Sequence, residues 1–238
     1  EIRLSLVGSE MCIRDRLGII KEPADNEETG KGEEGRNEIT LAGLMHYKGM
    51  AALCIMSFLY MGGHQNTFSI WFQTYLQTEN RILYTPEYTS VCMTFYWVGM
   101  VISRFICARL SHKISPRRVI LAGSISGILA MAFGMLLQTP AVWLSAVLWL
   151  GISTGAIYPM TFAISCEWFP ECSARVSSLV GIFTSTGGML CGWLVGKIAG
   201  CVSFNLAMYV PWISLAIVFW IVWRKFPVDK SPANSKII

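Results

Sequence analysis

Residues 119–166 read VILAGSISGILAMAFGMLLQTPAVWLSAVLWLGISTGAIYPMTFAISC, and none of them is Asp, Glu, Lys or Arg. A helix needs about 20 apolar residues to cross the hydrocarbon core of a bilayer, so this run is long enough for two crossings. Gln138, Thr139 and Pro140 interrupt the run near its middle and predict a tight turn. The stretch therefore predicts two consecutive membrane-spanning helices.

The charged residues of the whole chain are few and unevenly placed. Of 238 residues, 53% are hydrophobic and 14% are charged, whereas soluble domains are about 25% charged. Half of the 19 basic and 15 acidic residues precede Gly49. This composition predicts an integral membrane protein and argues against a soluble, disordered or small disulfide-bonded protein. The net charge of +4 forms no basic stripe, so we expect no nucleic-acid partner.

Six apolar windows follow residue 48, and short polar connections separate most of them. Their lengths suit helices that cross a bilayer, and they lack the strict alternation of polar and apolar residues that membrane strands require. We therefore predict an all-α fold, a polytopic membrane protein with six transmembrane helices. The windows cover residues 50–75, 88–110, 119–138, 142–166, 176–196 and 202–223.

The residues before the first window are set apart from the fold. Residues 5–16, SLVGSEMCIRDR, resemble a translated sequencing adapter, and a genuine amphipathic tail is the alternative. We interpret residues 1–16 as an artefactual tail. Residues 17–45 are polar and largely acidic and predict a cytoplasmic linker. Residues 46–226 are the predicted transmembrane domain, and residues 227–238 are a cytoplasmic tail.

Lys and Arg in the connections predict the orientation, because basic residues are retained on the cytoplasmic side of a membrane. Twelve of them fall on the face that holds both ends of the six-helix region, and two, Arg81 and Lys197, fall on the other. We therefore expect a multi-pass protein of the cell membrane with both termini in the cytoplasm.

Polar residues form stripes on three windows when successive residues are placed about 100° apart. The first stripe surrounds His64, the only ionisable residue near the middle of any window. Ionisable groups inside a membrane usually face a cavity or a partner. His64 is thus expected either to bind a ligand or proton, or to be a neutral histidine bonded to a neighbouring helix. The stripes hold Ser57, Tyr60, His64, Thr67, Trp71 and Tyr75; Ser90, Thr94, Trp97 and Arg104; and Thr154, Tyr158, Thr161 and Ser165. The predicted substrate-binding residues are Tyr60, His64, Gln65, Asn66, Thr67, Trp71, Trp97, Thr154 and Tyr158.

Glycines in two windows predict different roles. Gly62 and Gly63 can loosen the first helix and expose its backbone, as in the broken helices of transporters. Gly188, Gly192 and Gly196 lie four residues apart on one face of the fifth window, which predicts close packing against another helix.

Charged residues gather at the predicted cytoplasmic ends of the helices. Arg104 lies inside a helix end, where it needs an acidic or carbonyl partner. We predict a charge network that holds one conformation closed. The candidate gate residues are Gly99, Arg104, Arg109, Arg117, Arg118, Glu167 and Arg175.

The eight cysteines show neither a CxxC pair nor a metal-ligand spacing with His, so we expect free thiols, no metal and no cofactor. A single mid-membrane histidine without a neighbouring acid does not supply the acid, base and nucleophile that an enzyme needs. We therefore expect that the protein is not an enzyme.

Two of these motifs carry a family resemblance. The segment from Gly99 to Arg118 is similar to the signature loop that major facilitator superfamily transporters repeat between their eighth and ninth helices. The connection from Glu167 to Arg175, which leads into a Gly-rich helix, is also similar. Over about residues 41–226 the chain resembles the C-terminal six-helix half of such a transporter.

Within that superfamily, Tyr60-Met-Gly62 and the run from Tyr96-Trp97 to Arg104 look most like the fucose:proton symporter group. That group often has an acidic residue where this chain has His64, which leaves proton coupling open. The resemblance implies alternating access, with the first, second, fourth and fifth helices lining a central cavity. It also implies three partners: the lipid bilayer, a small-molecule solute, and either the missing N-terminal six-helix half or a second half-carrier.

The predicted function is secondary active transport of a sugar or similar small polar solute, because aromatic and amide side chains facing a cavity suit a hydroxylated ligand. One alternative is an exporter of amphipathic drug-like compounds, which an aromatic cavity also tolerates. Another alternative is a non-transport integral-membrane protein or membrane enzyme.

Overall fold

A computed structural model describes residues 47, 49–79, 82–110 and 114–226 of the chain. The regular structure of these residues is entirely helical, which confirms the predicted all-α fold. The predicted artefactual tail, the linker of residues 17–45 and the tail of residues 227–238 lie outside the described residues.

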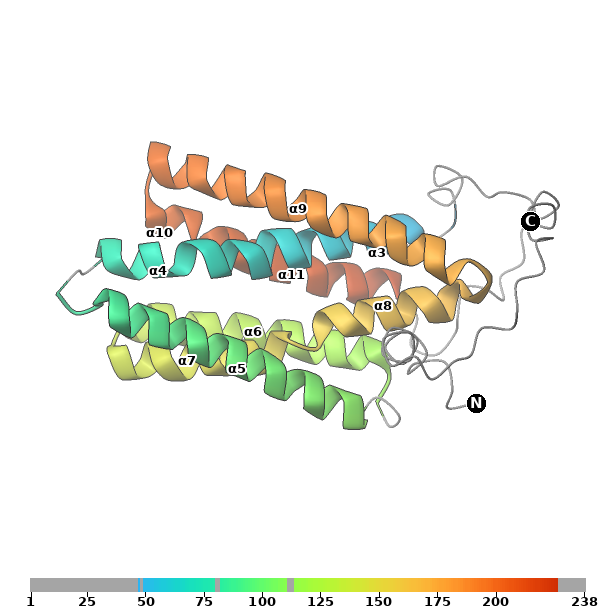
Figure 1. Cartoon of the computed structure of the whole chain (residues 1–238), viewed down its shortest axis with the longest axis horizontal. Coiled ribbons are helices and arrows are strands. Elements are labelled where there is room, and N and C mark those ends of the chain that lie inside the picture. Colours follow the sequence, from blue (N-terminus) through green and yellow to red (C-terminus); the bar gives the residue numbers. More distant parts are fainter. Residues whose placement is uncertain (1–46, 48, 80–81, 111–113, 227–238) are drawn as a thin grey trace, which may run out of the picture. The chain divides into compact units, whose positions relative to one another are not determined.

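The six predicted windows correspond to helical segments, and the first, fourth and sixth are each divided into shorter elements (Figure 1). Among the described residues, five segments are long and apolar enough to cross a membrane, and the first window is not one of them. The elements are α3 (Met50–Ser57), the π-helix η1 (Phe58–Asn66), α4 (Thr67–Glu79), α5 (Pro86–Leu110), α6 (Pro116–Leu137), α7 (Pro140–Thr154), α8 (Ile157–Trp168), the 3-10 turn η2 (Pro170–Cys172), α9 (Ser173–Cys201), α10 (Phe204–Ala207) and α11 (Tyr209–Lys225).

Local sequence explains where several helices begin and end. Pro116 and Pro140 occupy the first positions of α6 and α7, where the missing N–H costs nothing and φ already suits a helix. Gln138 ends α6 in the left-handed region at φ 45°. The tight turn predicted between these two helices is confirmed.

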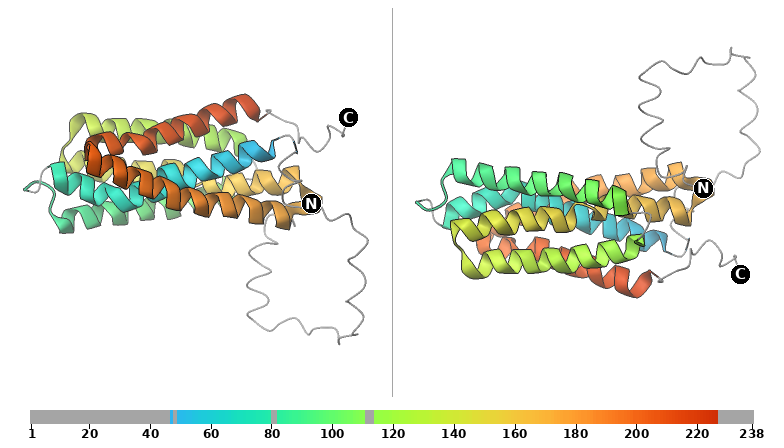
Figure 2. Two further views of the ribbon diagram at one scale, coloured as in Figure 1. Left: turned by 90° about the horizontal axis from the view of Figure 1, so that it is seen from above. Right: turned by 90° about the horizontal axis from the view of Figure 1, so that it is seen from below.

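The helices pack in a pattern that repeats between the first three spans and the last three. α5 packs along α7, and α9 packs along η1. α6 contacts α7 as α11 contacts η1, and α6 also contacts α11 (Figures 1 and 2). Exchanging the first, second and third spans with the fourth, fifth and sixth reproduces these contacts, although the contact of α9 with α10 is not matched between α5 and α6. The pattern is that of an approximate internal repeat of three spans.

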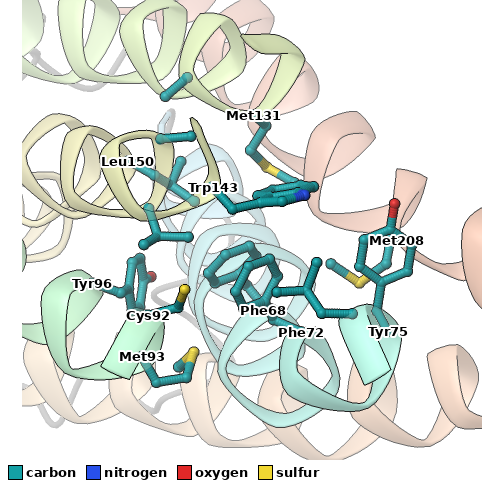
Figure 3. Packing of buried hydrophobic residues seen from close by; sticks show 14 of the residues in the cluster. Phe68, Phe72, Tyr75, Cys92, Met93, Tyr96, Met131, Trp143, Leu150 and Met208 are labelled. Carbon is teal, nitrogen blue, oxygen red and sulfur yellow. The ribbon is translucent and has the colours of Figure 1, made fainter. Parts of the chain in front are cut away.

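A cluster of buried aromatic residues joins the spans at the end of the bundle where α6 turns into α7. Figure 3 shows the rings of Phe68 and Phe72 beside Trp143, with Tyr96 next to them. The centroids of Phe68 and Phe72 are 4.5 Å apart, and those of Phe72 and Trp143 are 5.3 Å apart. These rings fix the first span against α5 and α7.

The outer faces of the bundle are apolar. Phe105 is 70% exposed, Leu136 81% and Met189 78%. Large exposed apolar side chains are unfavourable in water and suit contact with lipid. The fold thus has the surface of a polytopic membrane domain.

Candidate functional site

The first span is interrupted where its glycines lie. Over Phe58–Asn66 the backbone is a π-helix, and the hydroxyl of Thr67 donates to the carbonyl of Gly62 at 2.8 Å. A Cβ atom on Gly62 would lie 2.2 Å from the carbonyl carbon and oxygen of Gly187, and one on Gly63 would lie 2.1 Å from Ser214 Oγ. The two glycines therefore let η1 approach the backbone of α9 and the side chains of α11.

The fourth span is interrupted at a corresponding point. α7 ends at Thr154, and α8 begins at Ile157 after Gly155 and Ala156. The hydroxyl of Tyr60 donates to the carbonyl of Thr154 at 2.6 Å, and this hydrogen bond is buried. Because a carbonyl in hydrocarbon must find a donor, the bond satisfies the backbone where the helix stops. It also joins the two interruptions.

Aromatic rings line one face of the first span on both sides of this contact. Tyr60, His64, Phe68 and Phe72 are spaced by four residues and stand one above another. The ring centroids of Tyr60 and His64 are 5.9 Å apart, and those of His64 and Phe68 are 6.3 Å apart. Tyr96 of α5 lies 5.0 Å from Phe68. The site is thus a continuous aromatic column that contains one imidazole.

His64 is fully buried in this column. Neither ring nitrogen makes a well-formed hydrogen bond to any described residue, although the backbone of Pro211 lies toward the ring. A buried polar group without a partner is rare in folded proteins, and each case asks for a water, an ion, a ligand or a rearrangement. Both expectations for His64, a ligand or proton role and a bond to a neighbouring helix, stay predictions.

The residues predicted to bind substrate fall into two groups. Most lie inside the bundle, and the others are accessible from outside it. The buried residues are Tyr60, His64, Gln65, Thr67 and Thr154; Asn66, Trp71 and Tyr158 are half-buried; and Trp97 is exposed. The five buried residues lie in the packing between helices of this six-helix region, and the assignment of the nine residues to a substrate site stays a prediction.

The polar stripes differ in the same way. The first stripe is mostly buried, and the stripe of the second window, on α5, is exposed at Ser90, Thr94 and Trp97. In the fourth window the hydroxyls of Thr161 and Ser165 donate to carbonyls four residues earlier, at 2.8 Å. Hydroxyls that are satisfied within their own helix need no wet surface. On α5 the hydroxyls of Ser90 and Thr94 also donate to carbonyls four residues earlier, so the stripe on α5 differs from the stripe of the fourth window in its exposure and not in how its hydroxyls are satisfied.

The predicted gate residues lie in different surroundings. A Cβ atom on Gly99 would lie 2.6 Å from the carbonyl oxygen of Leu148, so this glycine belongs to the packing of α5 against α7. Arg117 Nη2 donates to the carbonyl of Trp223 at 3.1 Å. The other described side chains of the set are exposed: Arg104, Arg109, Arg118, Glu167 and Arg175.

The glycine stripe of α9 faces the first span. A Cβ atom on Gly188 would lie 2.4 Å from the side-chain nitrogen of Asn66, and one on Gly196 would lie 2.9 Å from the ring of Trp71. The indole nitrogen of Trp71 donates to the carbonyl of Gly192 at 3.2 Å. The structure thus places this stripe in a close helix contact, and Trp71 is part of it.

Two residues of this region were not among the predicted site residues. Tyr96 is fully buried, and its hydroxyl has no hydrogen-bond partner among the described residues. Gly155 marks the interruption of the fourth span, and a Cβ atom there would lie 2.8 Å from the backbone of Met100. The signals for them were present, since Tyr96 precedes Trp97 in the family motif and Gly155 is a glycine in the middle of a spanning window.

The described residues contain no group of three or more His, Cys, Asp or Glu side chains that could hold a metal ion. The described residues of the site instead offer aromatic faces, hydroxyl groups and one imidazole. Such groups bind and orient a neutral polar molecule.

Comparisons with known proteins agree with this architecture. The sequence pattern of the Major Facilitator Superfamily matches residues 53–237. A protein described as a putative glucose/galactose transporter of Helicobacter pylori (strain J99) is 21% identical over 209 residues, which are 85% of this chain and 49% of that protein. The glucose/mannose transporter GlcP of Bacillus subtilis is 23% identical over 150 residues, which are 63% of this chain and 36% of that protein. The chain thus spans about half the length, or less, of the curated relatives that it matches.

Proposed function

Because this chain belongs to the major facilitator superfamily, we propose that it is the C-terminal half of a secondary active transporter that moves a sugar or similar small polar solute by alternating access. Relatives described as glucose/galactose and glucose/mannose transporters support the substrate class. The N-terminal half of the same protein, or a second half-carrier, supplies the other wall of the cavity.

The observation that carries the proposal is the contact between two interrupted helices. In transporters built from inverted repeats, substrates bind near the bilayer midplane beside broken helices at equivalent positions of the two repeats. Here η1 and the α7–α8 break are equivalent under the contact symmetry, and Tyr60 bonds Thr154 between them. Backbone that is not held by regular helix can change conformation at low cost.

The proposal divides the predicted residues by role. Trp97, which is 44% exposed, offers a flat ring for stacking on a sugar, and Ser90 and Thr94 continue its polar face along α5. Asn66 and Tyr158 are half-buried and can reach a ligand from other helices. The buried residues around Tyr60 hold the interrupted helices in place.

Proton coupling is the finer part of the proposal. The likeness to the fucose:proton symporter group and the buried imidazole of His64, which makes no well-formed hydrogen bond to the described residues, support a role for this residue in coupling. We also place the protein in the cell membrane with both ends of the six-helix region in the cytoplasm, in agreement with the distribution of Lys and Arg.

The test is counterflow of labelled glucose, galactose and mannose into proteoliposomes that contain the product of the complete reading frame that includes this chain. Trp97→Ala should lower uptake of the preferred sugar at least about tenfold, because a stacked ring contributes about 1–2 kcal/mol. Phe95→Ala is the matched control, because Phe95 is also partly exposed on α5 but lies about 200° round the helix. Equal losses in both variants, or no sugar counterflow by the wild-type protein, would contradict the proposal.

A further inference from the structure

One end of the α6–α11 pair carries a group of four basic side chains, two of which, Arg117 and Arg118, are also candidate gate residues. α6 begins with Arg117 and Arg118 at its second and third positions, and α11 ends with Arg224 and Lys225. The two helices pack against each other, so these residues meet at one end of the bundle. Neither α6 nor α11 contains an acidic residue.

Arg117 joins the two helices at this end. Its Nη2 donates to the carbonyl of Trp223 at 3.1 Å, in the last turn of α11. The Nε of the same guanidinium is buried and has no hydrogen-bond partner among the described residues. One edge of the guanidinium is therefore used to hold the helix end, and another donor is left for a further acceptor.

Large indole rings flank the cations on α11. The guanidinium carbon of Arg224 lies 5.7 Å from the centroid of Trp220. Trp220 is 52% exposed and Trp223 is 59% exposed. Tryptophan is enriched where the hydrocarbon of a membrane meets its headgroups. Exposed indole rings beside basic side chains at the end of a helix are typical of the headgroup level of a membrane.

The backbone at the start of α6 adds little to the attraction for an anion. Pro116 has no N–H group, and the N–H of Arg118 already donates to the carbonyl of Ser115 at 3.0 Å. The attraction comes from the four basic side chains at the adjoining ends of α6 and α11.

We propose that the seam where α6 begins and α11 ends binds the phosphate of one anionic phospholipid. Arg118, Arg224 and Lys225 contact the headgroup, Arg117 bridges it to α11, and Trp220 and Trp223 pack along the glycerol and upper acyl chains. Carboxylates at the same end of the bundle, such as the exposed Glu167 on α8, only partly offset these charges. The occupant is a lipid and not soluble phosphate, because the rings beside the cations are apolar and outward-facing.

The experiment is native mass spectrometry of the product of the complete reading frame, released from nanodiscs that contain equal amounts of phosphatidylglycerol and phosphatidylcholine. The wild-type protein should retain one phosphatidylglycerol in preference to phosphatidylcholine. Arg118→Gln with Arg224→Gln should lower that preference roughly tenfold, since each basic residue near a charged surface contributes on the order of 1 kcal/mol. The charge-matched control is Arg104→Gln with Arg109→Gln, which removes two exposed cations from α5 and should leave the preference unchanged.

Three results would overturn the proposal. The first is equal retention of both lipids by the wild-type protein. The second is an equal loss of preference in the two double variants, which would mean general attraction to the basic end of the bundle. The third is displacement of the retained lipid by millimolar inorganic phosphate, which would assign the site to a soluble anion. If the double variant does not fold, Arg224→Gln alone keeps the contact of Arg117 with Trp223 and should still lower the preference.

Discussion

The hydroxyl of Tyr60 donates a 2.6 Å hydrogen bond to the backbone carbonyl of Thr154, 94 positions later in the chain. Tyr60 lies within the π-helix of the first span, and Thr154 is the last residue of α7. The bond therefore connects two of the places at which spanning segments stop being regular α-helices; another lies between α10 and α11. A side chain that satisfies a freed carbonyl in this way lets a helix break inside the membrane without an unpaired backbone group.

Replacing Tyr60 with Phe should reveal the value of that bond. The change leaves the ring in place but strands a buried carbonyl, so we expect the free energy of unfolding to fall by about 1–3 kcal/mol. Thermal or denaturant unfolding in detergent measures the loss. Tyr209→Phe is the matched control, because Tyr209 is 45% exposed. Similar stabilities of the two variants would mean that the Tyr60 hydroxyl contributes nothing.

The close approach of η1 to α9 makes a second prediction. A methyl group at Gly62 would lie 2.2 Å from the backbone of Gly187, which no side-chain movement can relieve. Gly62→Ala should therefore lower the free energy of unfolding by about 1–3 kcal/mol, or prevent folding.

Gly181→Ala on α9 is the control for this change, because no atom lies within 4 Å of the added methyl group. Alanine forms helices better than glycine, so this variant should be neutral or more stable by up to about 1 kcal/mol. A tolerated Gly62→Ala would show that the two backbones are farther apart than described.

The sequence predicted the spanning segments well, because long apolar runs and their proline and glycine boundaries act locally. The turn at Gln138, Thr139 and Pro140 is one example, and the helix contact made by Gly188 and Gly196 is another. In both cases a short stretch of residues contains the whole physical reason for the structure.

The sequence was a weaker guide to what each polar stripe faces. Periodicity assigns Thr161 and Ser165 to one side of a helix but does not say which helix covers that side. Their hydroxyls donate to carbonyls of their own helix. A stripe that is buried in this way has the same sequence pattern as a stripe that faces water. Gly62 and Gly63 predicted that the first span is interrupted. The π-helical form of the interruption depends on tertiary contacts with α9 and α11.

Substitutions of His64 should affect stability and transport differently. In His64→Phe the aromatic column keeps a ring while two unpartnered nitrogens are removed, so the free energy of unfolding should stay the same or rise by about 1 kcal/mol. Sugar uptake driven by a proton gradient should be lost. His64→Ala, in contrast, leaves a cavity and should reduce both properties.

The two measurements are unfolding in detergent and proton-driven uptake in proteoliposomes. A less stable His64→Phe would mean that the imidazole is hydrogen-bonded in the folded protein. Unchanged uptake and an unchanged pH dependence of uptake would remove His64 from the coupling mechanism.

Two tryptophans that the sequence placed in one site should behave differently. The indole N–H of Trp71 donates to Gly192, and its ring packs on Gly196. Trp97 is 44% exposed, and its ring makes an edge-to-face contact with the ring of its neighbour Tyr96, with centroids 5.5 Å apart. Trp71 is thus held in a helix contact, and Trp97 is available to a ligand.

Trp71→Phe should lower the free energy of unfolding by about 1 kcal/mol, because it removes a hydrogen bond, and should leave the KM for sugar uptake unchanged. Trp97→Ala should change the free energy of unfolding by less than about 0.5 kcal/mol, because the Trp97 ring is not part of the helix packing. The variant should raise the KM for sugar uptake, because the stacking contact with the sugar is lost. Unfolding and initial-rate uptake of both variants give the comparison. The reverse pattern would indicate that the sugar binds at the contact between the first span and α9 and not at the α5 face.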